Sequence, residues 1–171
     1  MTPKYEKVLA LATHVIRLDT QLGHLRWKVT DLSRHSRTPR SRVYELLGRN
    51  KPEMLKTALQ ALLEELYGIS AERLEYDKTN RFQGLVRSRQ IVMQAPELLG
   101  FYFRHRGRRD EIGELIRKNE DRFLKHLATS RGIKDEATLI FVRTVIHGIS
   151  LAPFLDEAQV SRIIKKLAEI E

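Results

Sequence analysis

The side chains that most often carry out covalent or metal-assisted chemistry are either missing from this sequence or unsuitably spaced. The chain has no cysteine, which excludes disulfides, thiolate nucleophiles and thiolate metal ligands. No glycine-rich phosphate loop precedes a Lys-Ser or Lys-Thr pair, and no serine lies in a glycine elbow. The histidines do not pair with another histidine or a glutamate at the spacing of helical metal sites; they are His14, His24, His35, His105, His126 and His147. We therefore expect neither an enzyme nor a bound metal or cofactor.

The residues that could still bind a partner by charge are arginine and lysine, and they are concentrated near the N-terminus. The 171 residues include 31 Lys and Arg against 22 Asp and Glu, which gives a formal charge of +9. Residues 1–51 hold 11 basic and four acidic residues, a net charge of +7, whereas residues 52–171 hold 20 and 18, a net charge of +2. Such a concentration favours a polyanionic partner, although a solvated basic face explains the same pattern.

Apolar residues recur at intervals of three and four along almost the whole chain, which indicates helices rather than strands. The polar residues 68–80 are expected to form a junction, or a less buried continuation of the helix before them. The sequence predicts an all-α fold of about nine helices, with one domain over residues 1–50 and a second over 51–171. The expected helices cover residues 4–19, 28–36, 39–47, 51–66, 80–94, 96–104, 110–128, 136–152 and 156–170.

The two short helices at 28–36 and 39–47 lie within the basic stretch and are joined by a tight connection. This arrangement is typical of a helix-turn-helix motif, whose second helix enters the major groove and presents its N-terminal residues to the bases. Thr38 is expected to cap that second helix, with Pro39 at its first position. Arginines follow in the first turn, where guanidinium groups can reach guanine or phosphate. The residues expected to face inward are Val43, Leu46 and Leu47.

The stretch from residue 8 to 66 resembles the DNA-binding domain of the tetracycline-repressor (TetR) family of bacterial transcriptional regulators. In that family a glycine follows the first helix, Val-x-Asp-Ile-Ala lies in the second, Thr-Leu-Tyr-x-x-Phe in the recognition helix and Lys-Glu-x-Leu in the fourth. Two later segments, 94–99 and 137–153, resemble the family's Asn-Pro-Glu-Leu segment and its penultimate, dimer-packing helix. The matching residues of the motif are Gly23, Val29-Thr30-Asp31-Leu32-Ser33, Arg42-Val43-Tyr44-Glu45-Leu46-Leu47 and Lys51-Pro52-Glu53-Met54-Leu55.

Four positions depart from the family pattern. Arg37 replaces the glycine of the turn, so a bulky residue must adopt the backbone angle that the turn requires. Trp27 replaces a small residue at the start of the second helix, where it can lie either in the core or on the DNA backbone. Leu47 replaces an aromatic residue, and one extra residue near Arg49 lengthens the loop to the fourth helix.

The resemblance implies DNA-binding roles for residues of this motif. Tyr44 is expected to contact a phosphate through its hydroxyl, or alternatively to pack half-buried against the first helix. Thr38 lies at the mouth of the recognition helix, and Lys51 matches a family lysine that meets the DNA backbone. The DNA-binding set implied by the resemblance is Lys28, Thr30, Arg37, Thr38, Pro39, Arg40, Ser41, Arg42, Tyr44 and Lys51.

The family places an effector pocket among its C-terminal helices, and aromatic and methionine side chains of this chain are candidates to line one. A stripe of such residues more often belongs to an ordinary hydrophobic core. The expected pocket residues are Phe82, Met93, Phe101, Tyr102, Phe123, Phe141 and His147.

The last two predicted helices carry more apolar residues than a peripheral helix pair buries alone. A two-fold interface between copies of the chain accounts for the excess, and it also sets two recognition helices at a fixed spacing. The residues expected in this interface are Leu139, Val142, Val145, Ile146, Ile149, Val160, Ile163, Ile164 and Leu167.

These features lead us to expect a DNA-binding transcriptional regulator, a repressor that binds a palindromic operator as a homodimer and is released by a small-molecule effector. The alternative is a TetR-like helical interaction protein that no longer reads DNA sequence. No apolar run approaches the roughly 20 residues that span a bilayer, and the N-terminus lacks the apolar block of a signal peptide. We therefore expect a cytoplasmic protein whose partners are double-stranded DNA and a second copy, with no membrane.

Overall fold

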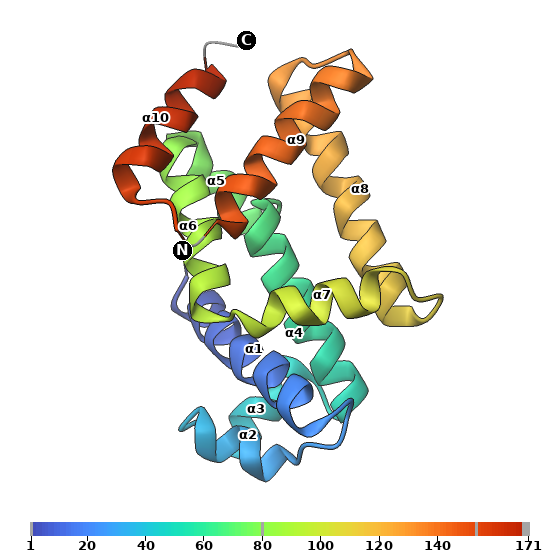
Figure 1. The fold of residues 1–171 in the computed structure, drawn as a ribbon. Helices are drawn as coiled ribbons and strands as arrows, with labels where there is room; N and C mark the ends of the chain where they lie inside the picture. The colour runs from blue at the N-terminus through green and yellow to red at the C-terminus, as the bar shows by residue number, and fades with distance from the viewer. Residues whose placement is uncertain (1, 80, 153, 169–171) are drawn as a thin grey trace.

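The computed structural model describes residues 2–79, 81–152 and 154–168, and in this part of the chain there are ten α-helices and no strand (Figure 1). The predicted all-α fold is confirmed. The ten helices are α1 (Pro3–Leu22), α2 (Val29–His35), α3 (Arg40–Leu47), α4 (Lys51–Tyr67), α5 (Ala71–Thr79), α6 (Arg81–Gln94), α7 (Glu97–Arg106), α8 (Glu111–Arg131), α9 (Glu136–Leu151) and α10 (Glu157–Ala168).

Polar side chains and glycines mark where several of these helices begin and end. The side chains of Asn50, Asp110 and Asp135 each accept a hydrogen bond from a backbone amide three residues later, at the starts of α4, α8 and α9. Helix α4 ends at Gly68, whose φ of 67° is left-handed and suits a residue without a Cβ. These local signals, together with the apolar periodicity, explain why the sequence predicts most of the helices to within a few residues.

One apolar core joins the N-terminal helices to the rest of the molecule. Helix α1 lies along α4, and the short helices α2 and α3 lie together at one end of the molecule (Figure 1). The buried core runs from Leu9 of α1 through α4, α7 and α8 to Val142 of α9. A second, smaller cluster joins α9 to α10 through Ile149, Val160 and Ile164. No described helix has the length and apolar character needed to cross a membrane.

The segment 68–80 differs from the expected polar junction. It contains a separate helix, α5, and the side chain of Arg73 within it is only 1% exposed. Arg73 is paired with groups on other helices, so the polarity of this segment does not indicate exposure. A sequence pattern does not reveal such pairing, because the partners come from distant positions.

Candidate nucleic-acid interface

Helices α2 and α3 form a compact pair joined by residues 36–39. The backbone amide of Thr38 donates to the carbonyl of Ser33 at 3.1 Å, and the Ser33 hydroxyl donates to the carbonyl of Thr38 at 2.7 Å. The amide of Ser36 donates to the carbonyl of Leu32 at 2.9 Å and ends α2. Because these bonds hold both sides of the connection, α3 has a defined orientation relative to α2.

Arg37 occupies the position in this turn where a glycine is common. Its φ is 51°, which is the left-handed region that L-residues with a side chain adopt at a cost of about 1–2 kcal/mol. The amide of Arg37 donates to the carbonyl of Arg34 at 3.3 Å, and the side chain is exposed. The substitution therefore keeps the turn and places an additional cation at the surface of the motif.

The predicted capping role of Thr38 is wrong. Helix α3 begins at Arg40 and its N-cap residue is Pro39, without a side-chain cap hydrogen bond. The Thr38 hydroxyl instead donates to the carbonyl of Ser36 at 3.1 Å, and the residue is 5% exposed. Thr38 thus holds the turn from inside and offers little surface to DNA, whereas Pro39 is exposed.

Trp27 lies in the core rather than on the surface. It is fully buried, and its indole Nε1 donates to Oδ1 of Asp19 at 3.0 Å. The same oxygen accepts the amide of Leu25 at 2.8 Å, and Oδ2 lies 3.2 Å from Nδ1 of His24. Asp19, a buried acid on α1 that sequence reasoning missed, therefore fixes the connection that leads into α2.

Helix α3 has one buried and one exposed face. Val43, Leu46 and Leu47 face inward as predicted, at 0%, 8% and 1% exposure. Ser41 and Tyr44 are exposed, and Tyr44 retains 41% of its accessible surface, so it does not pack half-buried against α1. The outer face of α3 is therefore available to a partner.

The two arginines in the first turn of α3 differ in their surroundings. Arg40 is exposed, and Arg42 is half-buried and forms an ion pair with Glu45 one turn later on the same helix. Glu45, the acidic residue on an otherwise basic helix surface, is therefore the ion-pair partner of Arg42. Both residues in the first turn, Arg40 and Arg42, lie in the part of a recognition helix that meets base edges.

The remaining predicted contacts lie around the two short helices. Lys28 is exposed just before α2, and Thr30 is half-buried in its first turn. The ammonium of Lys51, at the start of α4, donates to the carbonyl of Leu25 at 2.5 Å. Lys51 thus joins α4 to the connection that precedes α2, and its other two N–H donors remain for a phosphate.

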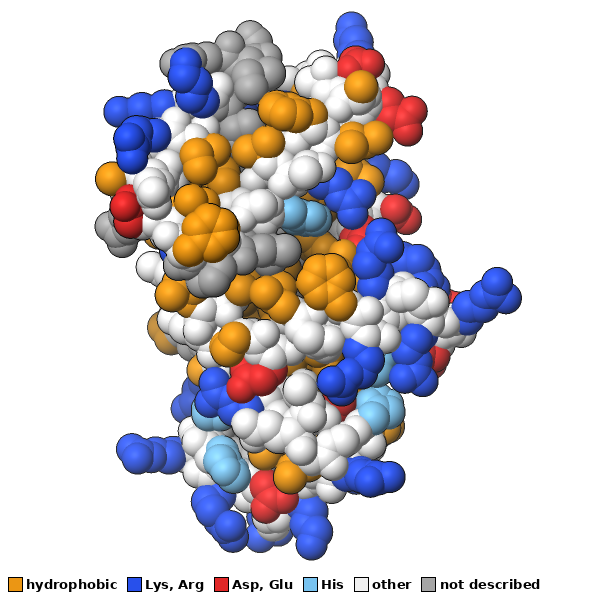
Figure 2. All heavy atoms as spheres, viewed as in Figure 1, with side chains coloured by type: hydrophobic (Ala, Val, Ile, Leu, Met, Phe, Trp, Pro, Cys, Tyr) orange, Lys and Arg blue, Asp and Glu red, His pale blue; other side chains and the backbone are white. Residues whose placement is uncertain are grey.

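The surface around the motif is positively charged. Lys and Arg side chains project from the end of the molecule formed by α2 and α3 (Figure 2). Several exposed cations of this region form no ion pair within the described part of the chain; they are Arg26, Lys28, Arg34, Arg37, Arg40 and Arg49. A polyanion approaching this end therefore meets a field of one sign.

The structure scatters most of the predicted effector-pocket residues. Met93 and Phe141 are 56% and 51% exposed, Phe101 is buried in the core, and the side chain of Phe82 lies outside the described part of the chain. Tyr102 is half-buried and donates a hydrogen bond to Glu120. None of the described side chains of this group lines either of the two cavities described below, so an effector pocket stays a prediction.

Two of the predicted pocket residues, Phe123 and His147, do come together. Their rings stack with centroids 5.7 Å apart, and each also meets the ring of Tyr67, at 5.0 and 5.5 Å. Nε2 of His147 is buried, with no hydrogen-bond partner among the described residues. Burial lowers the pKa of His147 to about 4, so its ring is neutral at neutral pH.

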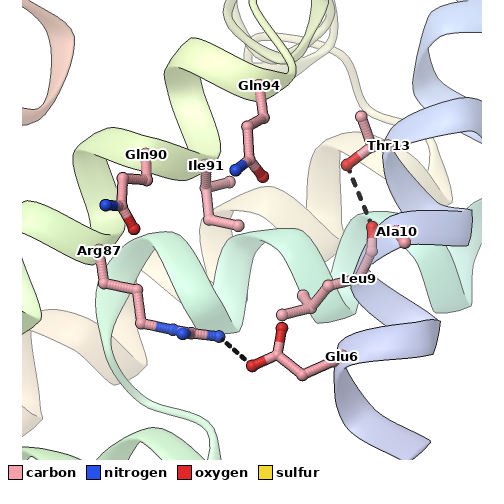
Figure 3. A pocket seen from close by; sticks show the side chains of 8 residues that line it. All are labelled: Glu6, Leu9, Ala10, Thr13, Arg87, Gln90, Ile91 and Gln94. Carbon is pink, nitrogen blue, oxygen red and sulfur yellow. Dashed lines mark hydrogen bonds and ion pairs between the residues drawn. The ribbon is translucent and has the colours of Figure 1, made fainter. Parts of the chain in front are cut away.

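Two cavities lie elsewhere. The first, of about 140 Å³, lies between α1 and α6 and is lined by both polar and apolar side chains (Figure 3). Arg87 at its edge is paired with Glu6 at 2.7 Å, which joins the two helices across the cavity. The second, of about 170 Å³, lies between the connection after α1, the start of α4 and the start of α8.

The predicted interface on α9 and α10 needs a correction. Val142, Ile149, Val160 and Ile164 are 7% exposed or less, because these faces pack inside the chain. The other predicted residues, Leu139, Val145, Ile146 and Ile163, are half-buried, and the side chain of Leu167 lies outside the described part. Periodicity identifies an apolar helix, but it does not tell which apolar side chains its own chain covers.

A different part of α9 is exposed and apolar. Ile140 and Phe141 are 53% and 51% exposed, and Ala137, Thr144 and Gly148 are exposed along the same helix at spacings of three and four residues. Hydrophobic side chains gather on this face of the molecule (Figure 2). An exposed apolar helix face of this kind is a candidate interaction surface.

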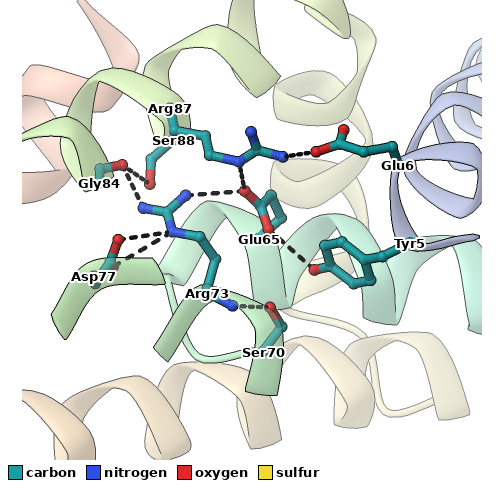
Figure 4. A network of polar contacts seen from close by, with 9 residues as sticks. All are labelled: Tyr5, Glu6, Glu65, Ser70, Arg73, Asp77, Gly84, Arg87 and Ser88. Atoms are coloured by element: carbon teal, nitrogen blue, oxygen red, sulfur yellow. Dashed lines mark hydrogen bonds and ion pairs between the residues drawn. The ribbon is translucent and has the colours of Figure 1, made fainter. Parts of the chain in front are cut away.

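A buried polar network joins the N-terminal helices to the C-terminal ones (Figure 4). Glu65 of α4 is fully buried and accepts hydrogen bonds from Tyr5 at 3.0 Å, from Arg73 at 2.9 Å and from Arg87. Arg73 also binds Asp77 at 3.2 Å, and burial raises the pKa of Asp77. Since α1, α4, α5 and α6 all contribute, the network fixes the motif relative to the rest of the molecule.

No cluster of three or more His, Asp or Glu side chains in the described residues is arranged to hold a metal ion. Compared with protein-family models, curated proteins and solved structures, the chain matches none. The features of the molecule that bear on its function are therefore the geometry of α2 and α3 and the motif residues within them.

Proposed function

We propose that this protein is a transcriptional regulator of the TetR type that binds a palindromic DNA operator as a homodimer. The observation that carries the proposal is the pairing of α2 and α3. A hydrogen-bonded turn presents an outer face of α3 that begins with Arg40 and includes Tyr44, within a surface rich in exposed cations. This is the arrangement by which a recognition helix enters the major groove.

The roles of individual residues follow from their positions. Arg40 and Arg42, at the N-terminal end of α3, contact base edges, and the arginine fork favours guanine. Tyr44 and the exposed cations Lys28 and Arg37 contact phosphates, which sets the register of the protein on the duplex. For Arg42 to reach a base, its ion pair with Glu45 must open.

The exposed face of α9 supports the dimer. Its apolar side chains need a cover, and a second copy of the same face provides one through two-fold symmetry. Two recognition helices then lie at a fixed separation and match two half-sites. Release by a small-molecule effector is also part of the proposal, and the two cavities are candidate sites for the effector.

Selection from a random pool of DNA duplexes tests this function. We expect the wild-type protein to retain an inverted repeat, and the variant R40A/R42A to lose that selectivity. The variant K125A/K134A, which removes two exposed cations from and beyond α8, is the matched control and should select the same repeat. Weak, uniform binding by the wild-type protein that disappears at modest salt indicates charge without sequence reading and contradicts the proposal.

A further inference from the structure

The segment Arg104–Arg109, of sequence RHRGRR, forms a second basic site at the end of α7. Arg106 is held by Glu120 at 2.7 and 3.1 Å, so its charge is neutralised. Arg104, Arg108 and Arg109 are exposed. Arg108 pairs with Asp110 at 2.8 Å, but both side chains of this pair are open to solvent, at 54% and 40% exposure, and the contact is correspondingly weak.

The loop that carries these arginines has a fixed conformation. Nη1 of Arg117 donates to the carbonyls of Arg106 and Arg108 at 3.0 and 2.7 Å. A Cβ added to Gly113 would lie 2.1 Å from the carbonyl oxygen of Arg108, so the loop packs against α8 more closely than any other residue at 113 permits. The backbone that carries Arg108 and Arg109 is therefore held in place by hydrogen bonds and by packing against α8.

This loop is linked to the connection that leads into α2 and to α4. His105 is 3% exposed, and its ring lies 4.3 Å from that of Phe101 and 5.7 Å from that of His24, in the connection that leads to α2. Lys56 of α4 pairs with Glu111, at the start of α8, at 2.6 Å. The end of α7 and the start of α8 are therefore joined directly to the elements that position α2 and α3 (Figure 1).

We propose that Arg108 and Arg109, with Arg104 beside them, contact the phosphates of DNA that flanks the half-site read by α3. The inference rests on the proposed function and adds a second, sequence-independent contact to it. A duplex is the one partner that continues past the motif with unbroken negative charge, about one charge per 1.7 Å of axis. Lys and Arg side chains project both around α2 and α3 and at the far end of α7 (Figure 2), so one extended polyanion matches both sites.

The test compares two duplexes that contain the selected repeat, one trimmed to the two half-sites and one extended by about ten base pairs on each side, the length of about one helical turn. Binding of the full-length protein is measured by fluorescence anisotropy over a range of salt concentrations. The variant is R108Q/R109Q, and the control is K125Q/K134Q, which removes the same charge from exposed positions in α8 and just beyond its end. Thermal melting followed by circular dichroism verifies that both variants are folded.

We expect R108Q/R109Q to bind the extended duplex roughly tenfold more weakly, with a salt slope lower by about 0.9 for each phosphate that the protein no longer neutralises. It should bind the trimmed duplex like the wild-type protein, and the selected repeat should not change. Equal affinities and slopes for variant and wild type on the extended duplex overturn the inference. An equal weakening on both duplexes overturns it as well, because the arginines then act within the half-site.

The outcome separates this inference from the proposed function. If the wild-type protein selects a repeat that R40A/R42A does not, the proposed function stands, whatever the loop variant does. If the wild-type protein selects no repeat, the two duplexes cannot be defined and both proposals fail together.

Discussion

The indole Nε1 of Trp27 donates a hydrogen bond to Oδ1 of Asp19 at 3.0 Å, and this contact joins α1 to the residue two positions before α2. Both residues are buried, and the amide of Leu25 donates to the same oxygen at 2.8 Å. One carboxylate thus satisfies two donors in the connection between α1 and α2. The orientation of the helix-turn-helix pair relative to α1 depends on this arrangement.

Replacing Asp19 by alanine should therefore destabilise the protein by about 3 kcal/mol, because each buried donor left without an acceptor costs about 1–3 kcal/mol. Urea unfolding followed by circular dichroism measures the change. D121A, at an exposed position of α8, should leave stability unchanged. A D19A protein as stable as the wild type contradicts the role given to this carboxylate.

The Glu65 network leads to a second stability prediction. E65Q keeps the shape of the side chain but removes the charge that faces Arg73 and Arg87, and Arg73 is 1% exposed. Breaking a buried ion pair on one side costs about 3–5 kcal/mol. We expect a decrease in that range by urea unfolding. E64Q, which alters the neighbouring half-buried acid paired with the exposed Arg122, is the matched control and should cost less than about 1 kcal/mol.

Periodicity and capping residues were sufficient to predict nine of the ten helices, because the apolar spacing and the caps are local properties of the sequence. Helix α5 was missed for a reason that is not local. Arg73 is charged but buried, and its partners Glu65 and Gly84 lie 8 and 11 residues away in the chain. The composition of residues 68–80 therefore looked like that of an exposed junction.

The candidate site was predicted only in part, because some of its features are local properties of the sequence and others are not. The inward side of α3 and the arginines of its first turn follow from helical spacing. Thr38 was placed wrongly because a threonine before a proline has two local hydrogen-bonding options, and here its hydroxyl donates to the carbonyl of Ser36. The role of Asp19 was missed, although the sequence carried a signal for it. This acid lies on the apolar face of α1, and an acid in such a position indicates a buried polar contact.

Acid should weaken the folded state through His147. Burial lowers the pKa of this ring from 6.5 to about 4. Between pH 4 and pH 6.5 the unfolded chain therefore binds a proton at this ring and the folded protein does not. The free energy of unfolding is for this reason highest above about pH 6.5, and it falls as the pH decreases to about 4. The decrease amounts to about 2–3 kcal/mol.

Unfolding free energies measured between about pH 4 and pH 7 check this behaviour. H147F keeps a ring against Phe123 and Tyr67 and should show a smaller decrease over the same interval. The pKa of His105 is also lowered by burial, so part of the decrease should persist in H147F. A variant with the same pH dependence as the wild type shows that His147 is not the responsible group.

The exposed face of α9 leads to a prediction about assembly. Two glutamates introduced by I140E/F141E place like charges in a two-fold interface, where they are desolvated without partners. We expect analytical ultracentrifugation to give twice the 20.0 kDa of one chain for the wild-type protein and a single chain for the variant. M93E, at an equally exposed position of α6, should stay dimeric. A monomeric wild-type protein contradicts the homodimer itself.

Arg37 offers a way to separate folding from binding with one substitution. Its φ of 51° is strained for arginine but ordinary for glycine, so R37G should stabilise the protein by about 0.5–1 kcal/mol, less than the full strain because glycine gives the unfolded chain more freedom. The same change removes an exposed cation from the proposed interface, so DNA affinity should fall and the salt slope should decrease by about 0.9. R34G, in the last turn of α2, removes the same charge but has no strain to relieve, and it should lower stability. Higher stability together with weaker DNA binding in R37G means that the arginine is retained for the contact rather than for the turn, whereas unchanged DNA binding removes Arg37 from the interface.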